Sequence, residues 1–479
     1  MARLIVVSNR VGIPDGSARA GGLEVSIRPA LKKRGGVWFG WSGRVAEGDP
    51  EPAKTAVHDN VSYVTVDLQK DDYDEFYNGF ANRVLWPILH YRLDLAEFTR
   101  RDLSGYFRVN QFFASNLEKI LRPDDVVWVH DYHLMPLAMT LRDRGHKNKI
   151  GFFLHIPCPP PEILTALPNH ERLVPALCQY DLVGFQTEID ATNFSRYLAN
   201  EVNLRRVGED AFLYDDRIVR VGVFPVGVET QAFSRLARRA VESSFVREVL
   251  ASMSGRAMII GVDRLDYSKG IPERMAAFER FLTNFPDWRG LVTYLQITPR
   301  SRTDIQEYAD IGRVVGEAVG RINGNFGEAS WTPVRYVNKA HSRTALAGLY
   351  RGARVALVTP LRDGMNLVAK EYVAAQDPEN PGVLVLSRFA GAARECGAAV
   401  LVNPYDPEGV AIAIDRALAM PLEERRMRHA ANFRVLVEND LSHWAERFLG
   451  LLEHPPAGED KPLVPPTATA NPARAAFSP

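Results

Sequence analysis

Short apolar runs typical of buried strands alternate with amphipathic runs typical of helices along almost the whole chain of 479 residues. This alternation predicts repeated βαβ units, and therefore an α/β fold of parallel sheets covered by helices on both faces. The expected strands are residues 4–7, 61–66, 126–129, 150–155, 182–185, 218–224, 258–262, 291–297, 334–337, 355–358, 383–386 and 398–402. Helices are expected between them, for example over 134–144, 343–351 and 366–375.

These strands are more than one doubly wound sheet comfortably holds, so two Rossmann-like domains are expected, facing each other with the active site in the cleft between them. We expect the first domain at 1–228 and the second at 229–430, joined near the Pro-Val-Gly-Val stretch 225–228. A C-terminal helical segment is expected at 431–453. Residues 454–479 are rich in proline, alanine and threonine without apolar periodicity, which predicts a disordered tail.

The composition argues against several classes of partner. Lysine plus arginine equals aspartate plus glutamate, 58 each, so no global charge favours nucleic acid or an anionic membrane. No apolar stretch approaches membrane-spanning length. The three cysteines, Cys158, Cys178 and Cys396, lack metal-site spacing, which fits a reducing cytoplasm and predicts no metal. We expect a cytoplasmic protein that binds small molecules and needs no cofactor, and homo-oligomerisation stays open.

Arg264 and Lys269 lie in one short loop between the strand expected at 258–262 and a helix whose apolar spacing starts at Met275. Open α/β sheets bind ligands at the carboxyl ends of their strands, and helix N-termini attract anions. A phosphate or diphosphate is the expected guest. For either cation alone, a solvated loop with ordinary surface charges is the better interpretation. The polar residues of the other loops shift the preference toward a phosphate site.

Polar residues follow most of the other expected strands as well. They form the segments 8–10, 130–133, 155–157, 298–302 and 359–366. In a doubly wound fold these strand ends lie on one side of the sheet. The glycine pair 21–22 precedes an i, i+4, i+8 apolar stripe and predicts a turn that opens a helix near a phosphate, although a plain turn is the default. Pro29 inside that stripe is expected to kink or shorten the helix.

The segment 359–371 carries the second strong signal. Gly364 permits an unusual turn whose backbone amides face an anion. Asp363 accepts hydrogen bonds only, which suits sugar hydroxyls, and Glu371 is one turn into the following helix, within reach of a ribose diol. The ordinary alternatives are a helix N-cap for Asp363 and a solvated surface position for Glu371.

Three other features have ordinary alternatives. His155 follows five apolar residues and, taken alone, reads as a core histidine, but its place at a strand end favours ligand contact. Large aromatic residues are expected to be mostly core, with one or two stacking on a sugar: Trp38, Trp41, Tyr77 and Trp86. The Asp-Tyr-Asp stretch 72–74 is similar to a metal-binding pattern, yet the start of a solvated helix over 71–80 is favoured.

Taken together, these segments resemble the trehalose-6-phosphate synthases, a family of retaining GT-B glycosyltransferases. The matching segments are 7–10 (VSNR), 21–23 (GGL), 38–43 (WFGWSG), 82–87 (NRVLWP), 90–92 (HYR), 130–134 (HDYHL), 150–157 (IGFFLHIP), 181–187 (DLVGFQT), 264–270 (RLDYSKG), 320–323 (GRIN) and 358–371 (VTPLRDGMNLVAKE). The resemblance spans residues 1 to about 450. It implies transfer of glucose from a nucleotide sugar, usually UDP-glucose, to glucose 6-phosphate, as in trehalose biosynthesis.

The resemblance also implies roles for individual residues. Arg264 and Lys269 would hold the donor diphosphate, and Asp131 and His155 would contact the reacting sugars. The donor glucose, phosphate and ribose would be held by Asp363, Asn366, Leu367 and Glu371. The acceptor pocket would be formed by Arg10, Tyr77, Trp86 and Arg302. Gly22 would let its loop close over the donor phosphate.

The chemistry fits these roles. Negative charge grows on the leaving diphosphate, and a preplaced guanidinium and ammonium stabilise it in place of a metal. In a retaining front-face reaction the leaving phosphate oxygen takes the acceptor proton, so no protein nucleophile is required. Three alternatives stay open: a sister transferase such as a glucosylglycerol-phosphate synthase or a pseudo-sugar coupling enzyme, a catalytically inactive homologue, and a pyridoxal-phosphate phosphorylase. The sequence does not decide between UDP, GDP and ADP.

Overall fold

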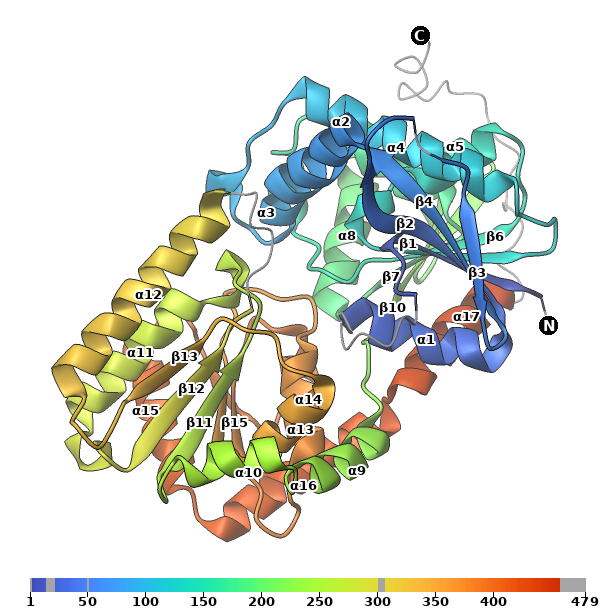
Figure 1. Ribbon diagram of the computed structural model, residues 1–479. Helices are drawn as coiled ribbons and strands as arrows, with labels where there is room; N and C mark the ends of the chain where they lie inside the picture. Colours follow the sequence, from blue (N-terminus) through green and yellow to red (C-terminus); the bar gives the residue numbers. More distant parts are fainter. Residues whose placement is uncertain (1, 14–21, 50, 300–305, 457–479) are drawn as a thin grey trace. The chain divides into compact units, whose positions relative to one another are not determined.

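The computed structural model describes residues 2–13, 22–49, 51–299 and 306–456 (Figure 1). Contacts divide the chain into two compact units. Unit 1 runs to Pro225 and resumes at Trp444, and unit 2 runs from Val226 to His443. The predicted domain limits, 1–228 and 229–430, stay predictions. The tail expected from 454 lies outside the described residues from 457 on, and so does Arg302.

Unit 1 contains a ten-stranded sheet, counted over the described residues, in the order β3-β4-β2-β1-β5-β6-β7-β10-β9-β8. Its strands are β1 (Leu4–Arg10), β2 (Gly36–Ala46), β3 (Lys54–His58), β4 (Val61–Gln69), β5 (Val126–His130), β6 (Lys149–Phe153), β7 (Leu182–Phe185), β8 (Arg205–Gly208), β9 (Ala211–Tyr214) and β10 (Arg217–Val223). The pairings from β4 through β10 are parallel, while β3, β8 and β9 add antiparallel edges. The sheet is therefore a parallel Rossmann-like core with antiparallel extensions.

The helices of unit 1 include one long π-helix. They are α1 (Gly22–Arg34), α2 (Lys70–Asp72), the π-helix η1 (Tyr73–Leu85), α3 (Trp86–Leu89), α4 (Arg100–Glu118), α5 (Leu137–Asp143), α6 (Pro161–Leu164), α7 (His170–Leu173), α8 (Glu188–Asn200) and most of α17 (Leu441–Glu453). The central strands are almost completely buried, as β1 and β5 show. Burial on both faces is what a parallel sheet covered by helices requires.

Unit 2 has a six-stranded parallel sheet in the order β13-β12-β11-β14-β15-β16. The strands are β11 (Ala257–Val262), β12 (Val292–Ile297), β13 (Val334–Val337), β14 (Val355–Val358), β15 (Val383–Ser387) and β16 (Val400–Val402). The helices are α9 (Thr230–Ala240), α10 (Ser244–Ala251), α11 (Ile271–Asn284), α12 (Gln306–Phe326), α13 (Arg343–Gly352), α14 (Leu367–Ala375), α15 (Pro407–Ala419) and α16 (Leu422–Glu438).

Alternate residues of the four central strands of unit 2 face opposite cores. Ile260 packs with the core of α9, α10, α13 and α14, whereas its neighbour Ile259 packs with that of α11, α12 and α15 (Figure 1). This alternation follows from the two-residue period of a strand. Two helical layers therefore cover the sheet, and the predicted doubly wound architecture is confirmed for this unit.

Four strands were not predicted from the sequence: β2, β3, β8 and β9. β2 is rich in glycine and serine, so its apolar run is interrupted. β3 is exposed at most positions and lies on an edge, where pairing rather than burial defines the strand. β8 and β9 form a short hairpin at the other edge. A search for apolar runs misses such strands because none of them is fully buried.

The helix expected over 71–80 is different from the prediction. Three residues of α2 lead into η1, which continues to Leu85. Asp72 is buried and accepts a hydrogen bond from Arg108 Nε at 2.7 Å, so the expected solvated helix start is wrong there. Helix α1 runs through Pro29 to Arg34, so the proline does not end it.

The C-terminal helix α17 packs on the sheet of unit 1. Trp444 and Phe448 lie 4.8 and 4.9 Å from the ring of Trp128 on β5, measured between ring centroids. A Cβ at Gly151 or Gly184 would lie 2.7 Å from the Phe448 ring. These two strand glycines therefore leave the space that the Phe448 ring occupies.

Candidate active site

The loop after β11 is locked by a buried carboxylate. Asp266 is fully buried, caps the short 3-10 helix Tyr267–Lys269, and accepts hydrogen bonds from Ser268 N at 3.0 Å and Ser268 Oγ at 2.9 Å. Arg264 Nη2 donates to Asp266 Oδ2 at 3.2 Å, while 44% of the Arg264 side chain stays exposed. The guanidinium is thus fixed through one terminal nitrogen, and the side chain is exposed enough to contact a ligand.

Lys269 from this loop meets the loop after β14. Its Nζ donates to Asp363 Oδ2 at 2.5 Å, and Asn366 Nδ2 donates to the same oxygen at 3.0 Å. Asn366, with φ of +74°, is the N-cap of α14 and accepts from Ala369 N at 3.3 Å. Asn366 therefore takes the capping role considered for Asp363. Leu367 is the first residue of α14.

Backbone hydrogen bonds join these loops to their neighbours. Leu361 N donates to Ser268 O at 2.8 Å, and Gly391 N donates to Asp363 O at 3.2 Å. Gly270 has φ of +63°, and a Cβ there would lie 2.5 Å from Thr359 O. A residue with a side chain would be strained and would clash at this position. The two charged loops are therefore built as one rigid surface at the carboxyl edge of the sheet.

Glu371 lies one turn into α14. Burial raises the pKa of its carboxyl to about 7, and the positive charge of Arg343 opposes that shift. The side chain is partly rather than fully exposed, so the solvated surface position considered from the sequence is wrong. A carboxyl that is half ionised near neutral pH is sensitive to a ligand that donates hydrogen bonds to it.

In unit 1, Asp131 and His155 come together at the ends of β5 and β6. Asp131 has φ of +75°, a conformation that costs energy for a residue with a side chain and is concentrated at functional sites. Its N donates to Phe153 O at 2.8 Å, and its Oδ1 accepts from His155 N at 3.3 Å. Two strand ends thus fix the aspartate and the histidine relative to each other.

His155 also pairs with a histidine that the sequence did not single out. His130 Nδ1 and His155 Nε2 are 3.0 Å apart and share one hydrogen bond. Burial lowers the pKa of His155 to about 3 and lowers the pKa of His130 well below its ordinary value. Both rings are therefore neutral at physiological pH. His130 lies inside the segment 130–134 that resembles the family. As the fully buried last residue of a strand, it has no sequence feature that marks it as a site residue.

The π-helix η1 brings aromatic rings together. Tyr77 stacks on Tyr73 with centroids 5.5 Å apart and on His133 at 5.9 Å, and Trp41 lies 5.8 Å from Tyr77. Tyr73 and Tyr77 are four residues apart, about one helical turn, so their rings lie on the same face of η1. Trp41 is buried, as expected, whereas Tyr77 is partly exposed. No periodicity in the sequence distinguishes this helix from an α-helix.

The remaining predicted residues of unit 1 are placed as follows. Trp86 is buried at the start of α3, 4.2 Å from His90 and 5.7 Å from Tyr132 between ring centroids. Arg10 is exposed at the end of β1, and a Cβ at Gly43 would lie 2.8 Å from its Nε. Gly22 is the first residue of α1. The predicted site residues that the structure describes thus fall in two groups, one in each unit. Most of them lie in loops after strands or at helix starts, whereas Tyr77 lies within η1 and Glu371 one turn into α14.

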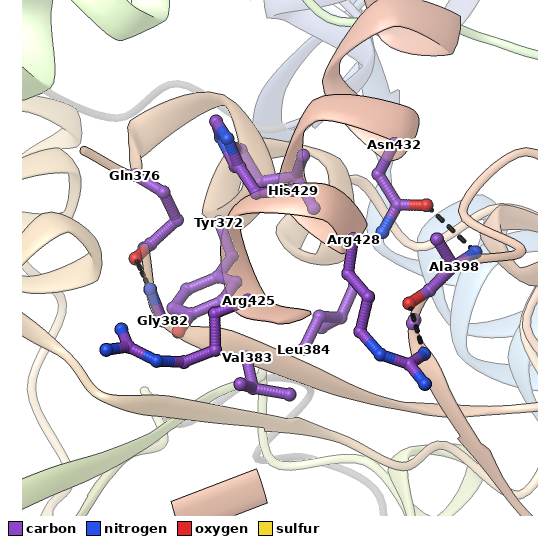
Figure 2. A pocket seen from close by; sticks show the side chains of 12 residues that line it. Tyr372, Gln376, Gly382, Val383, Leu384, Ala398, Arg425, Arg428, His429 and Asn432 are labelled. Carbon is purple, nitrogen blue, oxygen red and sulfur yellow. Dashed lines mark hydrogen bonds between the residues drawn. The ribbon is translucent and has the colours of Figure 1, made fainter. Parts of the chain in front are cut away.

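A small polar cavity elsewhere in unit 2 contains none of these residues. Figure 2 shows its lining from α14, α16 and the neighbouring strands, including Arg425, Arg428, His429 and Asn432. Asn432 Oδ1 accepts from Ala398 N at 3.0 Å, so this polar atom of the lining already has a hydrogen-bond partner within the protein.

In the described part of the chain, no three His, Cys, Asp or Glu side chains gather as a metal site. None of the described helices is long and apolar enough to cross a bilayer.

Solved structures define the class of this fold and site. A trehalose-phosphate synthase (UDP-forming) from Burkholderia xenovorans, in complex with glucose-6-phosphate, is 49% identical, has a TM-score of 0.92, and covers 95% of this chain and 100% of its own. An E. coli structure bound with UDP-2-fluoro glucose is 48% identical, with a TM-score of 0.90, and the match covers 95% and 99% of the two chains. The predicted GT-B class is confirmed, and the protein is a glycosyltransferase.

The family follows from two further comparisons. The model described as glycosyltransferase family 20 matches residues 13–454. A trehalose-6-phosphate synthase of Sinorhizobium fredii is 53% identical over 453 residues, which are 94% of this chain and 98% of the relative. The chain belongs to glycosyltransferase family 20.

Proposed function

We propose that this enzyme transfers glucose from UDP-glucose to glucose 6-phosphate with retention, giving α,α-trehalose 6-phosphate and UDP. The observation that carries the proposal is the likeness, over nearly the whole chain, to relatives named as trehalose-6-phosphate synthases. The loops of unit 2 support it, because they carry the cations Arg264 and Lys269, and Lys269 lies 2.5 Å from the Asp363 carboxylate, to which the Asn366 amide also donates at 3.0 Å. A nucleotide sugar needs that combination of charge and hydroxyl partners.

In this proposal Arg264 and Lys269 bind the donor diphosphate. As the bond from the anomeric carbon to the phosphate oxygen breaks, their charges stabilise the negative charge that develops there. The acceptor hydroxyl attacks the same face, and its proton passes to the departing phosphate oxygen. Lys269 is paired with Asp363, so its ammonium is oriented at the loop surface.

The donor sugar and ribose are bound by the start of α14. Asp363 accepts from glucose hydroxyls, the backbone at Asn366 and Leu367 faces phosphate, and Glu371 accepts from the ribose diol. The positive end of the α14 dipole adds to phosphate binding.

In this proposal Arg10, Tyr77 and Trp86 of unit 1 bind glucose 6-phosphate together with Arg302, which belongs to the chain segment of unit 2. Gly22 lets its loop approach the donor phosphate. Asp131 and His155 contact the reacting sugars. Because His155 is neutral near pH 7, its role is a hydrogen bond to a hydroxyl rather than proton donation from an imidazolium.

A matrix of donors and acceptors tests the proposal. UDP-, GDP- and ADP-glucose are each offered with glucose 6-phosphate, glycerol 3-phosphate and free glucose, and the product is identified by NMR. We expect the highest kcat/KM for UDP-glucose with glucose 6-phosphate, and an α,α linkage. Better use of glycerol 3-phosphate favours the sister-transferase reading, and a β linkage contradicts retention.

The pKa of Glu371 predicts how donor affinity depends on pH. The carboxylate form accepts the ribose hydroxyls, and its ionised fraction rises from about a tenth to about nine tenths between pH 6 and pH 8. The KM for UDP-glucose, whose diphosphate does not titrate in this range, should fall by about tenfold over that interval. Glu371→Gln should show a KM that is flat with pH.

The melting temperature of Glu371→Gln tests the direction of the pKa shift of Glu371. The raised folded-state pKa means that protonation favours the native state, so this contribution is present below the unfolded pKa and is lost as pH rises through about 7. Glu371→Gln should therefore gain melting temperature relative to the wild type at pH 8 and not at pH 5. An equal difference at both pH values contradicts the assignment.

Activity should persist in EDTA. The guanidinium of Arg264 and the ammonium of Lys269 supply the positive charge that a divalent cation supplies in metal-dependent transferases. Turnover is measured after dialysis against the chelator, with added Mg²⁺ as the comparison. Loss of turnover that Mg²⁺ or Mn²⁺ restores contradicts the prediction.

The cytoplasmic location and the oligomeric state remain predictions.

A further inference from the structure

Arg274 is a buried arginine near the start of α11, directly behind the loop that carries Arg264 and Lys269. Its side chain is completely buried, and its backbone N donates to Gly270 O at 2.9 Å. Its guanidinium donates hydrogen bonds to Lys269 O at 3.2 Å, Thr359 Oγ1 at 2.9 Å, Asp263 Oδ2 at 2.8 Å and Gln296 Oε1 at 3.1 Å. One side chain thus joins three separate parts of the unit: the loop after β11, the strand β12 and the loop after β14.

Two of these three parts are the loops of the proposed donor site. Lys269 O belongs to the loop after β11, and Thr359 starts the loop that leads to Asp363 and α14. The planar guanidinium offers five N–H groups in fixed directions, whereas an ammonium offers a compact charge without a fork. Only arginine among the cationic residues spans both loops and the Asp263 carboxylate together.

The strand beside Arg274 leaves space for this arrangement. A Cβ at Gly261 on β11 would lie 2.4 Å from Gln296 Oε1 and 2.9 Å from Arg274 Nη1. Any larger residue at this position would displace the guanidinium or its glutamine partner. The network is therefore accommodated by the backbone as well as by its own polar groups.

We propose that Arg274 is a positioning residue of the donor site, which fixes the Lys269 backbone and the Thr359 end of β14 relative to each other. The ammonium of Lys269 and the carboxylate of Asp363 are then presented at the spacing that the donor requires. This inference rests on the proposed function, because it assigns the purpose of the two loops to nucleotide-sugar binding.

A purely stabilising role accounts for the contacts less well. A buried ion pair contributes little net stability, because desolvation of the two charges offsets their attraction. Only one of the four side-chain bonds of Arg274 goes to a carboxylate, whereas three of them, to Asp263, Lys269 and Thr359, go to the two loops. Bonds that join functional loops are expected of a residue that sets geometry.

The test compares two variants with a matched control. Arg274→Lys keeps the charge beside Asp263 but loses the fork, and Thr359→Val removes one acceptor while keeping the side-chain shape. The control is Arg425→Lys, at another buried arginine of unit 2, which lines the cavity of Figure 2 and donates to Asn380 Oδ1 at 2.9 Å. UDP binding is measured by calorimetry, the KM for glucose 6-phosphate by assay, and the melting temperature for each variant.

We expect Arg274→Lys to raise the dissociation constant of UDP by about 10–100-fold, since charged hydrogen bonds that hold the loops are lost. Thr359→Val should raise it by about 3–10-fold, because one bond is lost. The KM for glucose 6-phosphate should stay within about twofold in both. Arg425→Lys should lower the melting temperature without changing UDP binding.

The inference is overturned if Arg274→Lys binds UDP within twofold of the wild type. It is also overturned if Arg425→Lys weakens UDP binding by as much, for each degree of melting temperature lost, as Arg274→Lys does. If Arg274→Lys does not fold, Thr359→Val decides, and unchanged UDP binding by it overturns the inference. A wild type that binds no UDP overturns the proposed function and this inference with it. A wild type that binds UDP no better than Arg274→Lys overturns the inference alone.

Discussion

Replacing Lys269 with alanine is expected to lower kcat by about 10²–10³-fold at saturating donor, and Arg264→Ala should have a similar effect. Each variant removes a positive charge from the point where the leaving diphosphate becomes more negative, and loss of one preorganised group of this kind typically has that magnitude. The Lys269 side chain is 13% exposed and fixed by Asp363, so its charge acts in a poorly solvated place. Steady-state kinetics with saturating UDP-glucose and glucose 6-phosphate give the comparison.

The control for these variants is Arg313→Ala on α12. Arg313 is exposed and pairs with Glu317 one turn along the same helix, a surface pair of small energetic value. Arg313→Ala should leave kcat unchanged. That result would show that the loss of an arbitrary positive charge from unit 2 does not by itself lower kcat. If either loop variant keeps kcat within about threefold of the wild type, the assignment of that cation to the diphosphate is wrong.

Arg10→Ala is expected to raise the KM for glucose 6-phosphate by about 10–100-fold and to leave the KM for UDP-glucose nearly unchanged. A charged hydrogen bond to phosphate contributes about 1.5–3 kcal/mol, which corresponds to that change in affinity. The guanidinium is exposed at the end of β1, beside Gly43, so it is available to a ligand. Initial rates over a range of each substrate separate the two constants.

Free glucose serves as the second measurement of the same pocket. The wild type should use it far less well than glucose 6-phosphate, and Arg10→Ala should narrow that preference. Arg144→Ala, at an exposed arginine of unit 1 that pairs with Glu118, should change neither value. Equal use of free glucose and glucose 6-phosphate by the wild type means that the phosphate pocket does not exist as proposed.

The buried parallel strands were predicted from the sequence because their signal is local. An apolar run bounded by polar residues marks a strand that is buried on both faces, and the predicted 182–185 and 355–358 coincide with the buried strands β7 and β14. The same reasoning placed the charged loops, since polar residues directly after such strands have to lie at the carboxyl edge of the sheet. The resemblance of the motifs to a family then supplied the activity.

Edge strands and the π-helix were decided by tertiary contacts. β3 has no buried run, and it is a strand because it pairs with β4. η1 and its stack of Tyr73, Tyr77 and His133 depend on a ring contributed by the segment after β5. No window of neighbouring residues contains that information.

The fine structure of the site was also set by distant residues. The sequence identified Lys269 and Asp363 separately, but their pairing joins residues 94 positions apart. The raised pKa of Glu371 comes from burial within the folded unit, and the positioning role proposed for Arg274 comes from three segments that meet at its guanidinium. Local pattern therefore determined which residues stand at the strand ends, while packing between distant segments determined their partners, orientation and protonation, because those depend on the dielectric and the neighbours that only the folded chain provides.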